Sequence, residues 1–323
     1  MKFSIIIPLY NRPQEIDELL DSLTRQRYTD FEVIVVEDGS TKDAAAVMEK
    51  YRGKLNLFYY QKQNEGQGFT RNFAFARATG DYFICFDSDC LIPENYLEVV
   101  HRRLETDWLD AYGGPDAAHP SFTPVQKAIS YSMTSLFTTG GIRGKEKNAG
   151  GTFHPRSFNM GISRKVWEAT GGYVITRMAE DIEFSIRIHA LDFRIGLIPE
   201  AIVYHKRRTS FFQFWKQLHF FGRGRINLSK QFGQKLKIVH FFPAAFTTFV
   251  GLTVVLNLTR SSMAPFCNVV LGLYVLLVFF DALRQTFSPR VAFLSVAAAF
   301  VQLLAYGFGF VQEGWKNLFL RQN

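Results

Sequence analysis

The chain has 323 residues, and 47% of them are hydrophobic, which is enough for one large domain or two smaller ones. The formal net charge of +8 is unevenly distributed, because residues 1–200 carry 27 acidic and 23 basic side chains whereas residues 201–323 carry 2 and 14. Three cysteines exclude a disulfide framework, and the apolar stretch at the N-terminus is too short for a signal peptide. We therefore expect the first domain to lie in the cytoplasm, with its thiols reduced.

The first hundred residues alternate between strand and helix patterns. Continuous apolar runs, typical of strands buried on both faces, lie at 3–9, 31–36, 55–60 and 82–86. Apolar residues at helical spacing lie between them, at 15–25, 42–51 and 68–78. This series predicts an α/β fold with a doubly wound, mostly parallel sheet. Ligands bind beyond the carboxyl ends of such strands, and Asp38, Asp87 and Asp89 all follow strand ends.

The middle of the chain is less regular. Residues 140–151 (GGIRGKEKNAGG) are predicted to form a mobile loop, and residues 163–169 and 181–191 to form helices.

Beyond residue 237 three apolar stretches follow one another, at 238–258, 266–283 and 291–311. Each is close to the ~20 residues that span a bilayer, although the second is the shortest and a re-entrant segment is its alternative. Buried core helices are disfavoured because three such stretches in succession are rare in soluble proteins. With the first domain inside, 11 flanking basic residues lie inside and 3 outside. The sequence thus predicts a multi-pass protein of the cell (inner) membrane, with its catalytic domain on the cytoplasmic side.

Residues 206–237 interleave aromatic and basic side chains. Single-stranded nucleic-acid sites share this composition, and so do amphipathic helices at a membrane surface. The membrane is favoured because apolar stretches follow at once, and no nucleic-acid partner is expected. The predicted organisation is a catalytic domain at 1–205, an interfacial segment at 206–237 and a transmembrane region at 238–323.

Five segments then occur in order: SIIIPLYNR, VVEDGS, NEGQGFTRNFAFARATGDYFICFDSD, FNMGISRKVWEATGGY and AEDIEFSIRIHALDFRIG. Together they resemble the inverting family 2 glycosyltransferases of the GT-A fold, over roughly residues 3–210, with a membrane-anchoring C-terminal extension. Two positions depart from the pattern. Arg12 stands where many relatives carry an acid, and Glu37 stands where Asp is common. Neither departure removes the expected chemistry.

The stretch ICFDSDC, residues 84–90, contains two cysteines and two aspartates. Structural zinc sites use thiolates in paired spacing, and Cys85 lies inside an apolar run, so we expect Cys85 to pack in the core. Carboxylate oxygens prefer Mg²⁺ or Mn²⁺, whereas an Asx-turn is the structural alternative. The resemblance implies that Asp89 binds the cation and that Asp87 lies near the cation or the ribose. It also implies that His205 contacts the cation or the diphosphate, with a structural hydrogen bond as the alternative.

A second group of residues forms the expected nucleotide pocket. The resemblance implies that Asp38 accepts a hydrogen bond from the nucleobase imide, so UDP or dTDP is expected in preference to GDP. A turn or a helix cap is the alternative for Asp38, and a structural ion pair is the alternative for Arg71, which is expected near phosphate. Tyr10 is expected to stack on the base. The residues of this pocket besides Asp38 are Pro8, Tyr10, Asn11, Asn64, Gly66 and Arg71.

Glu180 and Asp181 open a predicted helix, where the helix dipole stabilises carboxylates and is a sufficient structural explanation by itself. The resemblance implies that Asp181 is the general base, which takes the acceptor's proton as the acceptor oxygen attacks the anomeric carbon. A single displacement inverts the configuration at that carbon. The resemblance also places Glu180 and Asn159 in the substrate-binding pocket, with Asn159 on its acceptor side.

These features predict a membrane-anchored, metal-dependent inverting glycosyltransferase. Its donor would be a nucleotide diphosphate sugar, and its acceptor a hydroxyl of a glycan or of a lipid-linked glycan. Processive synthases carry Gln-x-x-Arg-Trp where this chain has Gln217 followed by LHFFGRGR, which favours the addition of a single sugar. The alternatives are a polyprenyl-phosphate glycosyl synthase, which needs no base, and a catalytically silent binding or scaffold subunit of a polysaccharide assembly system.

Overall fold

The computed structural model describes residues 1–140, 152–176, 179–232 and 236–319, so nearly all of the loop predicted at 140–151 lies outside the described residues. The described chain forms two compact units. The first comprises residues 1–119 and 152–206, and the second comprises residues 120–140 and 207–319. Residues 120–140, which the sequence analysis placed in the catalytic domain, thus belong to the C-terminal unit.

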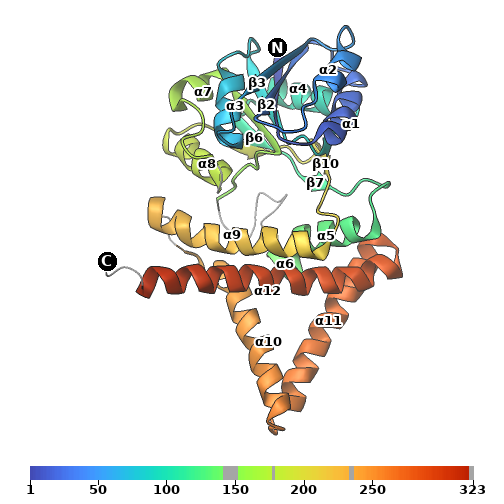
Figure 1. The fold of residues 1–323 in the computed structure, drawn as a ribbon, viewed down its shortest axis with the longest axis vertical. Helices are drawn as coiled ribbons and strands as arrows, with labels where there is room; N and C mark the ends of the chain where they lie inside the picture. The colour runs from blue at the N-terminus through green and yellow to red at the C-terminus, as the bar shows by residue number, and fades with distance from the viewer. Residues whose placement is uncertain (141–151, 177–178, 233–235, 320–323) are drawn as a thin grey trace. The chain divides into compact units, whose positions relative to one another are not determined.

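A seven-stranded sheet with the order β3-β2-β1-β4-β8-β6-β9 forms the centre of the first unit (Figure 1). Strand β1 pairs in parallel with β2 and β4, and β2 pairs in parallel with β3. Strand β8 runs antiparallel to β4 and to β6. The predicted doubly wound, mostly parallel sheet is therefore confirmed. The strands are β1 (Phe3–Leu9), β2 (Phe31–Asp38), β3 (Leu57–Lys62), β4 (Tyr82–Phe86), β6 (Ala111–Gly113), β8 (Asn159–Ser163) and β9 (Ile195–Leu197).

Helices cover both faces of this sheet because side chains along each strand alternate between its faces. Ile5 and Ile7 belong to a core with α1, α2 and α4, whereas Ile6 belongs to a second core with α3, α7 and α8. Cys85 is buried in this second core, as predicted. The helices are α1 (Pro13–Thr24), α2 (Ala45–Tyr51), α3 (Gln67–Phe75), α4 (Tyr96–Thr106), α7 (Arg164–Thr170) and α8 (Glu180–Ala190).

A small second sheet ties the end of the first unit to the segment that follows β4. Its order is β5 (Cys90–Leu91), β10 (Val203–His205) and β7 (Asp116–Ala117). Strand β10 runs antiparallel to β5 with His205 opposite Cys90. This pairing carries His205 to the turn that holds Asp87 and Asp89.

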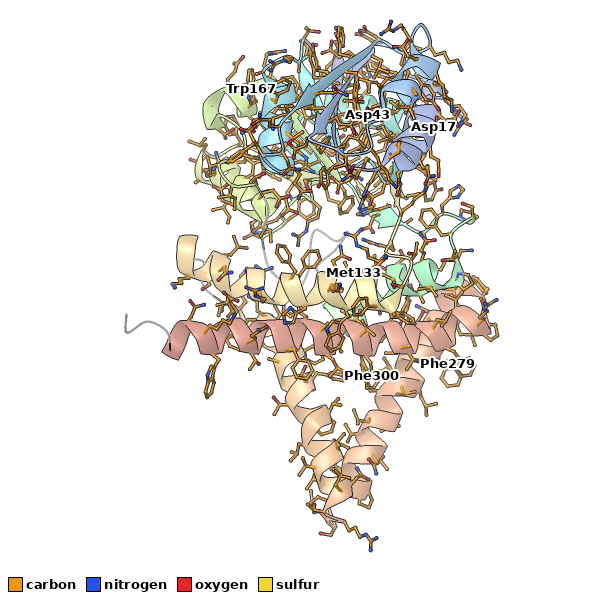
Figure 2. All side chains as sticks on the ribbon, viewed as in Figure 1. Asp17, Asp43, Met133, Trp167, Phe279 and Phe300 are labelled. Atoms are coloured by element: carbon orange, nitrogen blue, oxygen red, sulfur yellow. The ribbon has the colours of Figure 1, made fainter. Side chains whose placement is uncertain are left out.

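All regular elements described in the C-terminal unit are helices. In it α12 packs against α9 and α5 through a core that includes Met133, Phe214 and Ala305; Met133 is labelled in Figure 2. Helices α10 and α11 form a hairpin whose arms meet at residues 259–263 and diverge toward α12 (Figure 1). The elements are α5 (Pro124–Thr134), α6 (Leu136–Thr139), α9 (Phe211–Phe232), the 3-10 helix η1 (Ile238–His240), α10 (Phe242–Leu258), α11 (Ala264–Thr286) and α12 (Pro289–Phe319).

The number of predicted membrane spans needs correction. Two helices of the described chain, α11 and α12, are long and apolar enough to cross a membrane, whereas three spans were predicted. The first predicted span, 238–258, becomes η1 followed by the 17 residues of α10. Pro243 near the start of α10 suits the first turn of a helix, where its missing N–H costs nothing, and it marks where the regular helix begins.

Gly161 sits where β8 passes the ring of Tyr112, and it leaves no room for a side chain. A Cβ at this position would lie 2.0 Å from the Tyr112 ring. That ring is buried, and its hydroxyl lies 3.0 Å from the Tyr96 hydroxyl, so it has little freedom to move.

We expect Gly161→Ala to lower the free energy of unfolding of the first unit by about 1–3 kcal/mol, the usual cost of an overpacked core. Thermal unfolding of the full chain, followed by near-UV circular dichroism, measures the change. Gly314→Ala in α12 is the control, because a Cβ there meets nothing within 4 Å. Equal unfolding midpoints for the Gly161→Ala variant and the unsubstituted chain would contradict the expectation.

Candidate active site

The turn after β4 brings together acidic and basic residues from distant parts of the chain. The N–H of Cys90 donates to the carbonyl of Asp87 at 3.1 Å, and the N–H of Lys206 donates to the carbonyl of Asp89 at 2.9 Å. The pairing of β5 with β10 then places His205 Nε2 3.1 Å from Asp89 Oδ1. Asp89 and His205, which the sequence analysis assigned to one metal site, are neighbours in the fold.

Three residues in or next to this turn have potential metal-ligand atoms within 4.8 Å of one another: Asp89, Cys90 on β5 and His205 on β10. The Cys90 thiol lies 3.7 Å from the Phe158 carbonyl, to which it donates, so its sulfur is already engaged. A carboxylate and an imidazole remain, and these donors fit a hard divalent cation that also takes oxygens from a phosphate. The sequence analysis did not place Cys90 near His205. The two residues meet because β5 pairs with β10 in a register that sequence periodicity does not predict.

Arg12 is the residue at this turn that the sequence analysis left without a role. Its guanidinium forms an ion pair with Asp89 Oδ2, so both carboxylate oxygens of Asp89 face a basic side chain. Burial favours the neutral acid, but His205 and Arg12 outweigh it and hold the pKa of Asp89 well below its usual range. Asp89 is therefore an anion over the whole physiological range.

Arg71 lies on α3 and is completely buried. Its Nη2 is 2.7 Å from Asp87 Oδ1, and its Nη1 is 3.7 Å from Glu180 Oε1. The Tyr173 ring lies 5.5 Å from the guanidinium carbon. The structural ion pair considered for Arg71 is thus present, and it links the turn after β4 to the start of α8. The phosphate contact stays a prediction.

Glu180 and Asp181 begin α8, where three acidic side chains occupy the first turn. Asp181 Oδ2 lies 3.4 Å from Arg156 Nη1. Glu180 is buried and accepts a hydrogen bond from the side chain of Gln67. Burial first, and then the neighbouring Asp181, raise the pKa of Glu180 to about 7, against the opposing effect of Arg71.

Asp38 ends β2 and organises the loop that precedes α3. It accepts from the N–H groups of Glu65 and Gly66 at 2.9 and 2.8 Å, and from Lys62 Nζ at 3.0 Å. Burial would raise its pKa, but these donors outweigh burial and lower the pKa. Asn64 donates to the Asp38 carbonyl at 2.7 Å. The predicted base contact of Asp38 is untested, and its carboxylate already accepts several hydrogen bonds.

The end of β1 lies beside the end of β2, because the two strands pair in parallel. Asn11 has a positive φ of 53°, and its side-chain oxygen accepts from the N–H groups of Thr41 and Lys42 at 2.8 and 2.9 Å. Asn11 thereby joins the loops that follow β1 and β2. Tyr10 is 52% exposed, so its ring is free to stack on a ligand, and Pro8 is half-buried.

Asn159 differs from what was predicted for it. The residue is completely buried on β8. Its amide nitrogen donates to the carbonyls of Ala201 and Pro115 at 2.8 and 3.2 Å, and its oxygen accepts from the Tyr96 hydroxyl. These bonds hold the wall of the site together and leave no surface for the direct ligand contact assigned to Asn159.

The raised pKa of Glu180 gives a pH-dependent prediction. Between the ordinary value of 4.5 and about 7 the folded state binds more protons than the unfolded chain, so the free energy of unfolding falls as pH rises through that window. Glu180→Gln cannot lose a proton. At pH 8 we expect the free energy of unfolding of this variant to exceed that of the unsubstituted chain by about 1–3 kcal/mol, so that it unfolds at a higher temperature. Near pH 4.5 the two chains should be about equally stable.

Unfolding at both pH values, followed by circular dichroism, tests this expectation. Glu168→Gln on the exposed face of α7 is the matched control, and its effect should be small at either pH. A Glu180→Gln variant that is less stable at pH 8 would show that Glu180 stabilises the fold as an anion.

Comparison with known proteins places this chain in a family. The family model described as glycosyl transferase family 2 matches residues 4–170, just over half of the chain. Poly(ribitol-phosphate) beta-N-acetylglucosaminyltransferase TarS of Staphylococcus aureus strain MW2 is 44% identical over 102 residues, which are 30% of this chain and 18% of TarS. An uncharacterized glycosyltransferase of Haemophilus influenzae is 32% identical over 130 residues, which are 39% of this chain and 44% of that protein. The chain thus matches less than half the length of either relative.

Solved structures share the architecture. Mannosyltransferase PcManGT from Pyrobaculum calidifontis, in complex with GDP-Man and Mn²⁺, has a TM-score of 0.58 at 17% identity, over 99% of this chain and 88% of that chain. Residues 1–349 of S. aureus TarS in complex with UDP-GlcNAc have a TM-score of 0.50 at 21% identity, over 97% and 92% of the two chains. These likenesses show a shared GT-A type fold. On the match to its sequence model, the chain belongs to glycosyl transferase family 2.

Proposed function

We propose that this chain is a membrane-attached, divalent-metal-dependent inverting glycosyltransferase. It would transfer one sugar from a nucleoside diphosphate sugar to a hydroxyl of a glycan or a lipid-linked glycan. The observation that supports this most is the ion-pair chain through Arg71, which links Asp87 in the turn after β4 to Glu180, the neighbour of Asp181. This chain of contacts supports the proposal because it brings an expected donor-binding residue close to the neighbour of the expected base.

On the donor side, Asp89 and His205 would hold a divalent cation with the donor's phosphates, and Asp87 would lie beside it. When bound, the cation neutralises charge that develops on the departing diphosphate. Arg71 fixes Asp87 by its buried ion pair, so that carboxylate is set before a substrate arrives. Tyr10, exposed at the end of β1, would stack on the base opposite Asp38.

On the acceptor side, Asp181 would take the proton from the attacking hydroxyl. Its carboxylate lies at the start of α8, 3.4 Å from Arg156 Nη1. The attack would come from the face opposite the nucleotide, so an α-linked donor would give a β-linked product. Glu180, whose pKa is raised to about 7, would lie beside the base and be largely ionised above neutral pH.

The identity of the nucleotide in the donor can be tested by comparing nucleotide sugars directly. The solved relatives bind UDP-GlcNAc and GDP-Man, and we expect UDP or dTDP in preference to GDP here. A carboxylate at Asp38 suits the imide N–H of uracil or thymine. A donor that binds only the folded state raises its unfolding temperature, so a thermal-shift panel of nucleotide sugars with and without Mn²⁺ identifies the donor.

Membrane attachment is proposed through the hairpin of α10 and α11. At 1.5 Å per residue these helices are about 26 and 35 Å long, close to the ~30 Å hydrocarbon core. Large apolar side chains are exposed around the hairpin, among them Leu258, Phe266 and Leu273. Figure 2 shows side chains projecting outward along both arms. Only 17% of the apolar window of α11 is buried, which a lipid environment would explain.

Helix α12 has different surroundings, and we propose that it lies along the membrane surface. Half of its apolar window is buried, against α9 and α5 of the same unit. Arg223 on α9 pairs with Glu313 at 2.7 Å, and Lys230 donates to Asn317 at 2.9 Å. A basic helix such as α9 suits a headgroup layer rather than hydrocarbon. If only α10 and α11 cross the membrane, Arg260 is the single basic residue of 201–323 on the side opposite the catalytic domain. The excess of basic residues on the inner side is then larger than it would be with three crossings.

The role of Asp181 predicts a separation of binding from catalysis. Asp181→Asn should keep the affinity for UDP with Mn²⁺ and lower the transfer rate by about 10²–10⁴, the usual contribution of a general base. Calorimetry and product formation with the donor identified above measure the two quantities. Asp192→Asn, at an exposed position that Asn tolerates, is the control.

Near-normal turnover of Asp181→Asn would reject Asp181 as the base. That result would instead favour transfer to a lipid phosphate, which needs no deprotonation. Failure of the chain to bind or hydrolyse any nucleotide sugar with Mg²⁺ or Mn²⁺ would favour a silent scaffold subunit.

The two-crossing arrangement predicts which residues a membrane-impermeant maleimide reaches in sealed vesicles. Single cysteines at Thr209 and Gln312, both exposed, should be labelled from the same side, and a cysteine at Ser261 from the opposite side. The native cysteines are buried, so their background is low, and a chain without introduced cysteines controls for it. Labelling of Gln312→Cys together with Ser261→Cys would show that α12 crosses the membrane as well.

A further inference from the structure

Arg12 occupies a place where its charge acts directly on the expected cation site. It precedes α1, and its guanidinium pairs with Asp89 Oδ2 while His205 faces Oδ1. The Asp89 side chain is nearly buried, at 8% exposed, whereas the Arg12 side chain is 32% exposed. Each oxygen of the cation-binding carboxylate thus already faces a basic group, and the more accessible partner is Arg12.

A divalent cation and Arg12 compete for this carboxylate. The cation needs an oxygen of Asp89, and a guanidinium on the same carboxylate repels it across a short, poorly solvated distance. Asp89 does not depend on Arg12 for its position, because Lys206 N–H holds its carbonyl and β5 pairs with β10 directly after it. Arg12 therefore affects the charge of the site more than its shape.

A diphosphate removes this conflict. It brings negative charge to the place where the cation binds, and the planar fork of an arginine matches phosphate oxygens as well as it matches a carboxylate. The Arg12 carbonyl accepts from the N–H of Ile16 within α1, so the backbone is anchored while the side chain keeps its freedom to turn. Arg12 can exchange Asp89 for a phosphate without a shift of the helix.

We propose that Arg12 is a positioning residue that makes cation binding depend on the donor's diphosphate. The inference rests on the proposed function, because it takes Asp89 as a cation ligand. Arg12 pairs with Asp89 when no diphosphate is bound and disfavours the cation alone. With the diphosphate present, Arg12 turns to a phosphate oxygen and releases Asp89. Cation and nucleotide then strengthen each other's binding by the same factor, as linkage requires.

The test measures Mn²⁺ binding by electron paramagnetic resonance on the full chain in detergent, with and without UDP. Arg12→Gln should bind Mn²⁺ alone about tenfold more tightly than the unsubstituted chain, and the gain in Mn²⁺ affinity on adding UDP should shrink by a similar factor. Arg12→Lys keeps the charge and should stay closer to the unsubstituted chain. Arg25→Gln, which removes an equal charge from an exposed ion pair with Asp21, should change neither quantity.

A merely structural Arg12 gives a different pattern. Arg12→Gln would then bind Mn²⁺ alone no more tightly, or more weakly, and the gain on adding UDP would be unchanged; either result overturns the inference. If Arg12→Gln fails to fold, the same comparison is made with Arg12→Met, which also removes the charge, and unchanged Mn²⁺–UDP coupling in that variant is the contrary result. If the unsubstituted chain binds no Mn²⁺ with UDP, dTDP or GDP, the proposed function itself fails and takes this inference with it.

Discussion

Charge compensation at one edge of a parallel sheet is the constraint on which the rest of this site depends. Parallel strands end on the same side, so their terminal carboxylates gather where few water molecules can screen them. Each must find a cation or a set of donors, and each does: Lys62 and two backbone N–H groups for Asp38, Arg71 for Asp87, and Arg12 with His205 for Asp89. Glu180 is the exception, because burial and the neighbouring Asp181 raise its pKa more than Arg71 lowers it.

Arg71 shows what such compensation achieves beyond neutrality. A fully buried guanidinium is costly to desolvate, and removing either partner of a buried ion pair costs more than removing the pair. The guanidinium therefore holds Asp87 firmly at 2.7 Å, whereas Glu180 lies farther away at 3.7 Å. Arg71 thus lies between the two segments that carry these carboxylates, the turn after β4 and the start of α8. In the proposed function, donor and acceptor must be held in fixed register, and the Arg71–Asp87 ion pair would help to hold the donor side.

In the C-terminal unit the features that need explanation are exposed apolar side chains rather than buried charges. Its hairpin exposes apolar side chains that no part of the described chain covers, while α12 finds partners in α9 and α5. Close approach of helices depends here on small residues: a Cβ at Gly222 would lie 2.1 Å from the Tyr306 carbonyl, and one at Gly309 would lie 2.1 Å from the His219 carbonyl. Apolar length alone does not separate a helix that meets lipid from one that meets other helices. The number of spans was overestimated because the stretch at 238–258 divides into η1 and the 17 residues of α10.

The sequence by itself determined the alternating α/β order, the buried strands and the positions of Asp38, Asp87 and Asp89 at strand ends, because periodicity of two and of 3.6 residues is local. It also predicted the acidic pair at the start of α8. Only the tertiary structure decided the partners of these acids. The register of β5 against β10 brought His205 and Cys90 to Asp89, and the fold placed Arg12 on Asp89 and Arg71 between Asp87 and Glu180. It likewise buried Asn159 and assigned residues 120–140 to the helical unit. Contacts between residues far apart in the chain depend on sheet order and register, and no local pattern encodes them.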